Sequence, residues 1–458
     1  MADSAPLTHR RVLTIALPIV LSNATVPILG VVDTGVVGQL GQAAPIGAVG
    51  IGAIILSTFY WVFGFLRMGI TGLTAQAAGA DDTAEVQALL SRALLIGFAA
   101  GAVIIAAQIV LFALAFAVSP ASAEVEALAR DYMAIRVWSA PATIMLYGVT
   151  GWLIAQERTR AVLAIQVLMN GANIGLDLLF VLGFDWGVAG VAWATFIAEW
   201  AGLALGIWLC RDAFTGTAWR AVELVFDRVR LAHMAMVNTD ILIRSVLLQA
   251  IFVSFLFFGS DFGDVQLAAN QILMQFLSVT AYALDGFAFA AEALVGRALG
   301  ARAPGSLRRS AVLASVWGAG TCAVLALCFA IFGGMITDLM AKSEPVRAAA
   351  RVYLPYMIAA PILGVAAWML DGVFIGATRT RDMRNMMVIS ALAYFAAVIP
   401  LISAFGNHGL WLALLFSFVV RGATLGWKYP ALERQASEPV APAASDRIRD
   451  AGEPIAGE

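Results

Sequence analysis

The chain repeats itself at a fixed offset of 221 residues, and this internal repeat constrains the fold more than any other feature. Arg158-Thr159-Arg160 recurs as Arg379-Thr380-Arg381, and Gly151 recurs as Gly372 in the same register. Further matches, which need no gap, lie upstream: Ala127, Ala129, Arg130 and Tyr132 recur as Ala348, Ala350, Arg351 and Tyr353, and Leu73, Gly79 and Ala80 recur as Leu294, Gly300 and Ala301. A duplicated membrane domain is the usual ground plan of a secondary transporter, in which the substrate path lies between two halves.

The composition predicts an all-α protein that crosses a membrane many times. The chain is 61% hydrophobic and 13% charged, with a mean hydropathy of +0.87, whereas a soluble domain carries about 25% charged residues. Its three cysteines and three histidines are scattered, without the spacing of a metal site or a disulfide framework. We therefore expect no metal, no cofactor and no enzymatic chemistry.

Twelve segments are long and apolar enough to cross a bilayer as helices, which takes roughly 20 residues each. They predict an N-terminal six-helix lobe in 1–210, a cytoplasmic linker at 211–230, a C-terminal six-helix lobe in 231–428 and a disordered cytoplasmic tail at 429–458. Because six is even, both lobes enter the membrane from the same side and form parallel repeats. The spans lie near 11–37, 44–66, 89–117, 132–155, 161–182, 188–210, 231–258, 267–290, 310–333, 353–376, 385–403 and 408–428.

Arginines in the short loops predict the orientation. Most of them, including Arg158, Arg160, Arg379 and Arg381, fall in loops on the same side as the N-terminus. Because positive residues stay inside, both termini are expected in the cytoplasm of a multi-pass protein of the cell inner membrane.

Four polar residues predict a site in the outer half of the first lobe. Asp33 and Asp177 precede the outer ends of their helices by a similar number of residues, and Thr195 lies at a similar depth on the sixth helix. Asn173 lies one turn from Asp177 on the same face. Such a group could hold a proton or a small cation, although each residue could equally cap or bind a neighbouring helix. The repeat partners of the two acids are Ser254 and Val398, so the second lobe lacks both.

Other ionisable residues in the spans predict less. Asp240 and Arg244 are four residues apart on one helix and are expected to neutralise each other. Asp371 and Asp285 suit either a structural role or a second site, Glu292 is expected at the water boundary, and Glu199 has no partner that the sequence reveals.

Pro18 and Pro27 lie on the first helix, which also carries Asp33. A proline inside a helix removes a backbone hydrogen bond. The helix is expected either to change its bend at Pro18 or to hold a static kink.

Three segments resemble the multidrug and toxin extrusion (MATE) family, and its DinF branch in particular. They read LPIVLSNATVPILGVVDTGVVGQLG at 17–41, NTDILIRS at 238–245 and LDGVFIGATRTRDMRN at 370–385. The resemblance covers about 11–428 and implies a two-lobe exporter with a V-shaped cavity, driven by antiport against protons or sodium.

The resemblance also implies roles for single residues. An acid on helix 1, surrounded by Asn and Asp on helix 5 and Thr on helix 6, is implicated in cation coupling, and Asp33, Asn173, Asp177 and Thr195 stand at those positions. Helix 1 of such proteins bends at a proline, which Pro18 matches. Asp371 matches an acid of the sodium-linked branch, but the acidic partner on helix 7 is not evident, which argues against a second sodium site.

Four competing classes fit less well. A major facilitator protein would carry a basic Asp-Arg motif after helix 2, and RMGITGLTAQAAGADD lacks it. A lipid-linked flippase would line its cavity with cationic residues, and the first-copy spans hold almost none. An enzyme would need a cluster of His or Cys residues, and the sequence shows none. The asymmetric duplication disfavours a channel. We expect a monomer in the lipid bilayer that exports a small molecule, suited to lipophilic cations, and that binds no nucleic acid.

Overall fold

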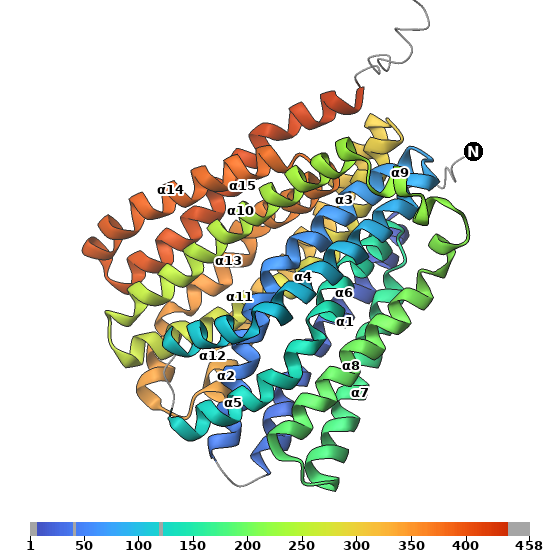
Figure 1. The fold of residues 1–458 in the computed structure, drawn as a ribbon. Helices are drawn as coiled ribbons and strands as arrows, with labels where there is room; N and C mark the ends of the chain where they lie inside the picture. Colours follow the sequence, from blue (N-terminus) through green and yellow to red (C-terminus); the bar gives the residue numbers. More distant parts are fainter. Residues whose placement is uncertain (1–6, 40–42, 119–121, 438–458) are drawn as a thin grey trace, which may run out of the picture.

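The computed structural model describes residues 7–39, 43–118 and 122–437, without the side chains of 26–31, 33 and 34. This part of the chain consists of helices and loops, so the predicted all-α fold is confirmed (Figure 1). Eleven of its helical runs are long and apolar enough to cross a membrane, and the 30-residue helix α1 adds the twelfth.

The first six predicted spans form one lobe. The second and fourth spans are each built from two helices joined by a single tight turn, at Val62–Gly64 and Val137–Ser139. The fifth span ends in a wider π-helical turn, Leu178–Gly183. The helices are α1 (His9–Gly38), α2 (Ala43–Trp61), α3 (Phe65–Gly79), α4 (Thr83–Val118), α5 (Ala123–Arg136), α6 (Ala140–Ala155), α7 (Thr159–Asp177) and α8 (Gly187–Leu209).

The last six spans form the second lobe, which follows short helical turns that include α9 (Val222–Val225). The last helix continues to Ser437, so the predicted tail boundary at 429 is too early. The helices are α10 (Arg228–Ser260), α11 (Asp264–Gly300), α12 (Pro304–Met340), α13 (Glu344–Gly376), α14 (Thr380–Phe405) and α15 (Asn407–Ser437).

The backbone follows the repeat. Four of the five described non-glycine residues with positive φ form two pairs that the 221-residue offset relates: Asp81 with Arg302, and Glu157 with Thr378. The fifth, Asp185, has Gly406 as its repeat partner, and φ is positive there too. Both members of each pair lie in a turn between two helices. Left-handed turns are rare for such residues, so the two copies share local geometry as well as sequence.

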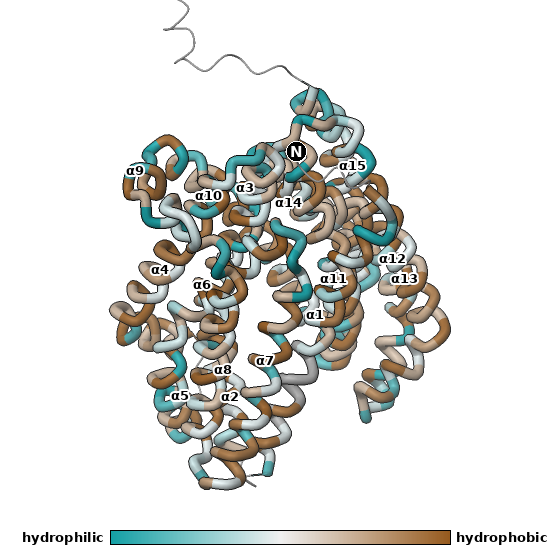
Figure 2. Tube along the Cα trace, turned by 90° about the vertical axis from the view of Figure 1, so that its right-hand side faces the viewer, coloured by the Kyte–Doolittle hydropathy of each residue, from teal (hydrophilic) through white to brown (hydrophobic). Residues whose placement is uncertain are grey.

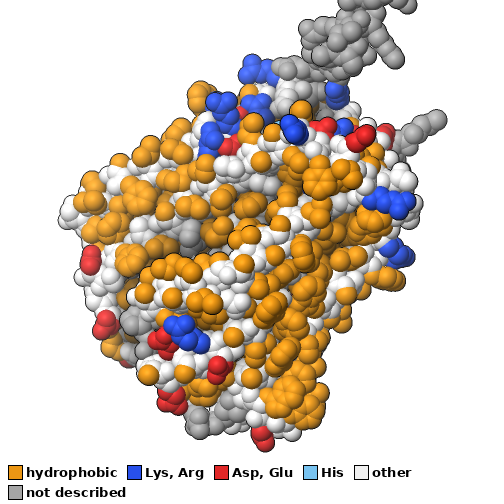
Figure 3. Space-filling model, viewed as in Figure 1, with side chains coloured by type: hydrophobic (Ala, Val, Ile, Leu, Met, Phe, Trp, Pro, Cys, Tyr) orange, Lys and Arg blue, Asp and Glu red, His pale blue; other side chains and the backbone are white. Residues whose placement is uncertain are grey.

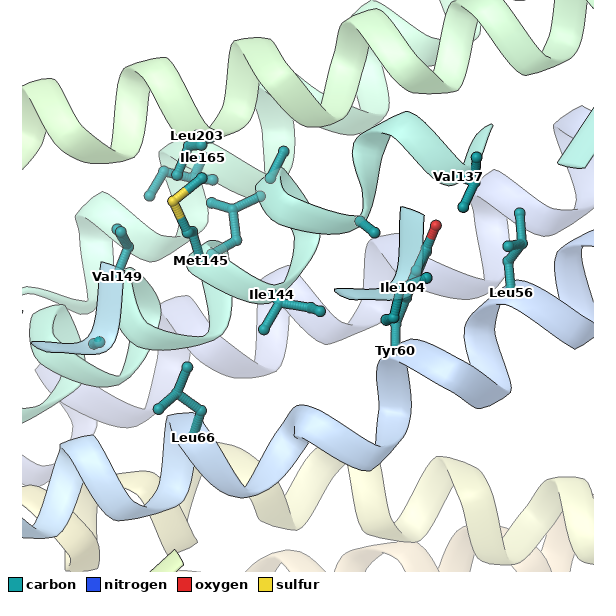
Figure 4. Close-up of a cluster of buried hydrophobic side chains, with 14 of the residues drawn as sticks. Leu56, Tyr60, Leu66, Ile104, Val137, Ile144, Met145, Val149, Ile165 and Leu203 are labelled. Carbon is teal, nitrogen blue, oxygen red and sulfur yellow. The ribbon is translucent and has the colours of Figure 1, made fainter. Parts of the chain in front are cut away.

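Apolar side chains hold each lobe together. In the first lobe, Leu56, Leu66, Ile144 and Ile165 belong to one buried cluster (Figure 4). Along the chain, apolar residues predominate in the middle of the helices, and hydrophilic residues are more frequent near their ends (Figure 2). Many large apolar side chains are exposed, among them Ile109, Leu327 and Leu392. A surface of this kind is stable in lipid rather than in water.

The two lobes meet at one end of the bundle. The helices of the first lobe, among them α2, α5 and α7, diverge from α12 and α13 toward the opposite end (Figure 2). The closed end carries both described termini and is called the terminal end below; the other is the far end.

A seam of repeat-related residues closes the terminal end. A Cβ on Gly79 would overlap the carbonyl oxygen of Arg297, and a Cβ on Gly300 would overlap that of Gln76. Gly79 and Gly300 are repeat partners, as are Gln76 and Arg297, so α3 and α11 make the same contact twice. We call these four residues the terminal seam.

Candidate functional site

A ladder of polar side chains runs along the face of α7 that meets α1 and α8. Near its middle, Asn170 Nδ2 donates to Thr25 Oγ1 of α1 at 2.7 Å. About one turn further on, Asn173 Nδ2 donates to Asp177 Oδ2 at 2.9 Å and to Thr195 Oγ1 of α8 at 3.3 Å. The structure therefore brings together three of the four residues predicted for this site.

The cluster is buried. Asn173 is 1% exposed and Asp177 0%. Asp177 is the last α-helical residue of α7, directly before the π-helical turn. Such turns are frequent at functional sites, and this one was not readable from the sequence.

The side chain of Asp33 lies outside the described residues, but its backbone lies on α1. Thr25 and Asn170 fix the register between α1 and α7. Asp33 follows Thr25 by eight residues and Asp177 follows Asn170 by seven. At about 1.5 Å per residue, helices that run side by side in the same direction bring both acids to one level.

The equivalent place in the second lobe carries neither acid. Val398 and Tyr394 are fully buried there, and Ser254 Oγ lies 3.4 Å from the Tyr394 hydroxyl oxygen. The fold therefore does not need a carboxyl at this position, and the acids of the first lobe are a local addition.

A cavity of about 460 Å³ lies between the lobes, against α3, α10, α11, α13 and α15. Three arginines and three acids line it. They are Arg67, Arg244, Arg421, Asp285, Glu292 and Asp371.

The charges of the cavity are mostly paired across helices. Arg67 of α3 donates to Glu292 of α11 at 3.0 Å, so Glu292, 1% exposed, is not at a water boundary as expected. Arg244 pairs with Asp371 of α13. Asp285 accepts a hydrogen bond from the Asn23 amide at 3.3 Å.

The predicted pairing of Asp240 with Arg244 is wrong. Asp240 accepts hydrogen bonds from Arg384 and from Thr380, both on α14. The two residues share a helix, but Arg244 faces the cavity and Asp240 does not line it. A spacing of four residues allows an ion pair within a helix. Here both side chains instead pair with residues on other helices.

This correction predicts a coupling pattern in stability. Asp371→Asn leaves two buried arginines without their shared acid, and Arg244→Gln leaves Asp371 with only the more distant Arg421, so each should lower the melting temperature. The double variant should lose less free energy of unfolding than the sum of the two single losses, with a coupling energy of about 0.5–3 kcal/mol. Arg244→Gln combined with Asp240→Asn should be additive. A coupling of Arg244 with Asp240 in place of Asp371 would contradict the assignment.

The remaining membrane acid of the first lobe also has a partner. Glu199 of α8 pairs with Arg136, at the end of α5, at 3.0 Å. Both side chains are 11% exposed. This pair lies within one lobe and is suited to a structural role.

Pro18 lies in α1 where that helix touches the second lobe. A Cβ on Gly286 of α11 would overlap Val20 and the carbonyl of Ala16, on either side of Pro18. Because α1 also packs along α7, it contacts both lobes.

An ionic clamp flanks the terminal seam. Glu157, in the turn before α7, accepts from Arg11 Nη2 at 2.6 Å and from Arg297 Nη1 at 2.9 Å. Its repeat partner Thr378 accepts from Gln76 Nε2 at 2.9 Å. The two halves of the clamp are thus equivalent in position, but only one of them is charged.

The clamp predicts a pH dependence. Burial alone would raise the pKa of Glu157, but Arg11 and Arg297 outweigh it and hold the pKa below its ordinary value of 4.5. A carboxyl with a lowered pKa stabilises the closed seam fully above that ordinary value and loses its contribution as the pH falls through the lowered pKa. The contribution of Glu157 to the distance between spin labels at Thr83 and Ser306, both exposed at the terminal end, should therefore stay constant between pH 8 and 5 and be lost only in stronger acid.

Glu157→Gln should abolish that acid response, and Thr378→Ala should keep it. An opening of the wild-type seam near neutral pH that survives in Glu157→Gln would show that another group controls this end.

Comparison with known proteins gives one consistent result. A family model described as MatE matches residues 18–179 and again 241–401, close to the repeat offset. DNA damage-inducible protein F of Escherichia coli (strain K12) is 38% identical over 426 residues, which is 90% of each chain. A probable multidrug resistance protein NorM of Rhodopseudomonas palustris is 26% identical and covers 93% of this chain and 92% of its own.

Solved structures share the fold. The Vibrio cholerae MATE transporter VcmN in the bent form superposes with a TM-score of 0.85 at 19% identity, over 93% of this chain and 97% of that one. An outward-facing MATE transporter of the MOP superfamily gives a TM-score of 0.81 at 16% identity, over 94% and 97%.

Proposed function

Because the chain belongs to the multidrug and toxin extrusion (MATE) family of transporters, we propose that it exports drug-like or lipophilic organic compounds in exchange for a cation, with protons as the driving ion. Sodium is the second candidate ion. The chain acts as a monomer in the cell inner membrane, with both termini in the cytoplasm, and does no enzymatic chemistry.

The buried cluster of Asn173, Asp177 and Thr195 is the observation that carries the proposal. An ionisable residue inside a membrane is costly and is by default functional. The equivalent position Val398 supports this interpretation, because it is buried and the second lobe folds without an acid there. The proposal assigns Asp33, whose backbone on α1 lies at the same level, to this cation site, which loads from the far end.

The surface supports the orientation. The visible Lys and Arg side chains gather mostly at the terminal end, above a wide apolar belt (Figure 3). With positive residues inside, the terminal end is cytoplasmic. The arrangement with a closed terminal seam is then the outward-facing state, and alternating access opens the seam and brings the far ends together.

Helix α1 connects the cation site to the seam. It carries Asp33, packs on α7 and touches α11 on both sides of Pro18. Protonation of the cluster changes which packing of α1 is preferred, as a local switch does. Distances between labels at the exposed far-end residues Ser122 and Ser343 should depend on pH in the wild type and less so in Pro18→Ala. Equal pH dependence would make the proline a static kink.

The proposal is tested in proteoliposomes with separately imposed gradients. Uptake or efflux of a fluorescent organic substrate is measured under a proton gradient alone, a sodium gradient alone and neither. Transport that follows the proton gradient, and that Asp177→Asn suppresses while the exposed-site control Asp131→Asn does not, supports proton antiport. Equal transport without any gradient would refute coupled export.

A further inference from the structure

Arg421 is a buried cation without a close acid of its own. It lies on α15 and lines the cavity between the lobes, with a side chain 3% exposed. Within the described part of the chain its guanidinium donates no hydrogen bond. Its nearest acid, Asp371, lies 3.7 Å away and already pairs with Arg244. Because a buried charge needs a partner, this group of two arginines and one aspartate has one positive charge in excess.

The other two acids of the cavity, Asp285 and Glu292, interact with Arg67 and Arg244, and neither forms an ion pair with Arg421 within the described residues. Glu292 is paired with Arg67. Asp285 lies on α11 and accepts a hydrogen bond from the side-chain amide of Asn23. Helix α15, which carries Arg421, packs mainly against α13 and α14 rather than against α11. The positive charge is therefore local to the α13 and α15 wall.

An aromatic surface lies beside the same guanidinium. Phe418 is one turn before Arg421, and its ring centroid lies 5.4 Å from that of Trp368 and 6.4 Å from that of Phe252. All three line the cavity. Its volume of about 460 Å³ lies in the range that encloses drug-sized ligands. A ligand with a negatively charged head group and an apolar body could therefore contact the guanidinium and the aromatic rings at the same time.

We propose that this cavity takes an amphiphilic organic anion. Its carboxylate or sulfonate accepts hydrogen bonds from Arg421, while its apolar body lies against Phe418, Trp368 and Phe252. Charge-assisted hydrogen bonds to a guanidinium are among the strongest available. The repeat partner of Arg421 is Trp200, so the duplication does not impose this arginine. The inference rests on the proposed transport function, since it names the substrate class of the same cavity.

Binding without any gradient tests the inference. Purified full-length protein in lipid nanodiscs is titrated with 1-pyrenebutyrate and with the matched cation 1-pyrenebutyl-trimethylammonium, and only saturable binding above empty nanodiscs is counted. The wild type should bind the anion at least tenfold more tightly. Arg421→Gln should lose at least tenfold in anion affinity, about 1.4 kcal/mol, and Arg421→Lys should lose less. Because no gradient is present, failure of cation coupling would leave these results unchanged.

Matched variants separate the site from a general charge effect. Arg384→Gln removes an arginine that pairs with Asp240 outside the cavity lining, so it should bind the anion like the wild type. Arg421→Gln leaves Arg244 and Asp371 as a neutral pair and should fold. If Arg421→Gln does not fold, the relative affinity of the wild type for the anionic and the cationic probe still tests the proposal. Equal or tighter binding of the cationic probe, or unchanged anion affinity in Arg421→Gln, would overturn the proposal.

Discussion

Replacing Gly79 and Gly300 together with alanine is expected to hold the terminal end open and to stop transport. Each new Cβ would overlap a backbone carbonyl of the facing helix, and a carbonyl in a helix cannot move without the helix. Overpacking a close contact costs about 1–3 kcal/mol, so two such contacts cost about 2–6 kcal/mol. A swing from 99:1 to 1:99 takes about 5.5 kcal/mol. The double variant should therefore lose most of its seam-closed population, and each single variant only part.

Spin labels at Thr83 and Ser306 measure this change directly. The distance between them should increase in the double variant, and efflux should fall to the background rate. Gly50→Ala, on the neighbouring helix α2, is the control, because a Cβ at this position would have no neighbouring atom within 4 Å. Helical stability should not fall, because alanine is the better helix former. Wild-type distances with wild-type transport would mean that the seam yields more easily than its backbone contacts imply.

Asp33→Asn is expected to abolish gradient-driven efflux while the protein stays folded. The register set by Thr25 and Asn170 brings position 33 of α1 to the level of Asp177. An amide is similar in shape to a carboxyl but can neither bind nor release a proton. Under the proposed mechanism the variant is therefore fixed in one state of loading, and the loss should exceed a hundredfold, or about 2.7 kcal/mol.

The measurement is efflux from proteoliposomes under an imposed proton gradient, with melting temperature as the check on folding. Asp131→Asn, on the exposed surface of α5, removes an acid of the same type away from the cluster and should retain wild-type transport. Asp33→Asn at the wild-type rate would remove Asp33 from the coupling site.

The sequence-based predictions succeeded where local spacing decides the outcome. The repeat offset predicted the two lobes and even pairs the left-handed turns at Glu157 and Thr378. The shared depth of Asp177 and Thr195 predicted that they lie at one level, because rise per residue is constant in a helix, and both accept a hydrogen bond from Asn173.

They failed where the rotation and tilt of distant helices decide the outcome. Arg384, which pairs with Asp240, is 144 residues away, and Arg244 and Asp371 are 127 residues apart. Arg67 lies just past the predicted span at 44–66 and Arg421 inside the one at 408–428, and the sequence did not indicate that both line one cavity. Periodicity indicates which residues share a face of a helix, but it does not indicate which other helix that face meets.

The unequal clamp at Glu157 and Thr378 has an evolutionary consequence. Gene duplication produced two equivalent positions in the clamp, and only one of them, Glu157, carries a charge. Substitutions in a single short turn can therefore lengthen or shorten the lifetime of the closed seam without altering the cation cluster or the cavity. The pace of the transport cycle can drift between relatives while their chemistry stays the same.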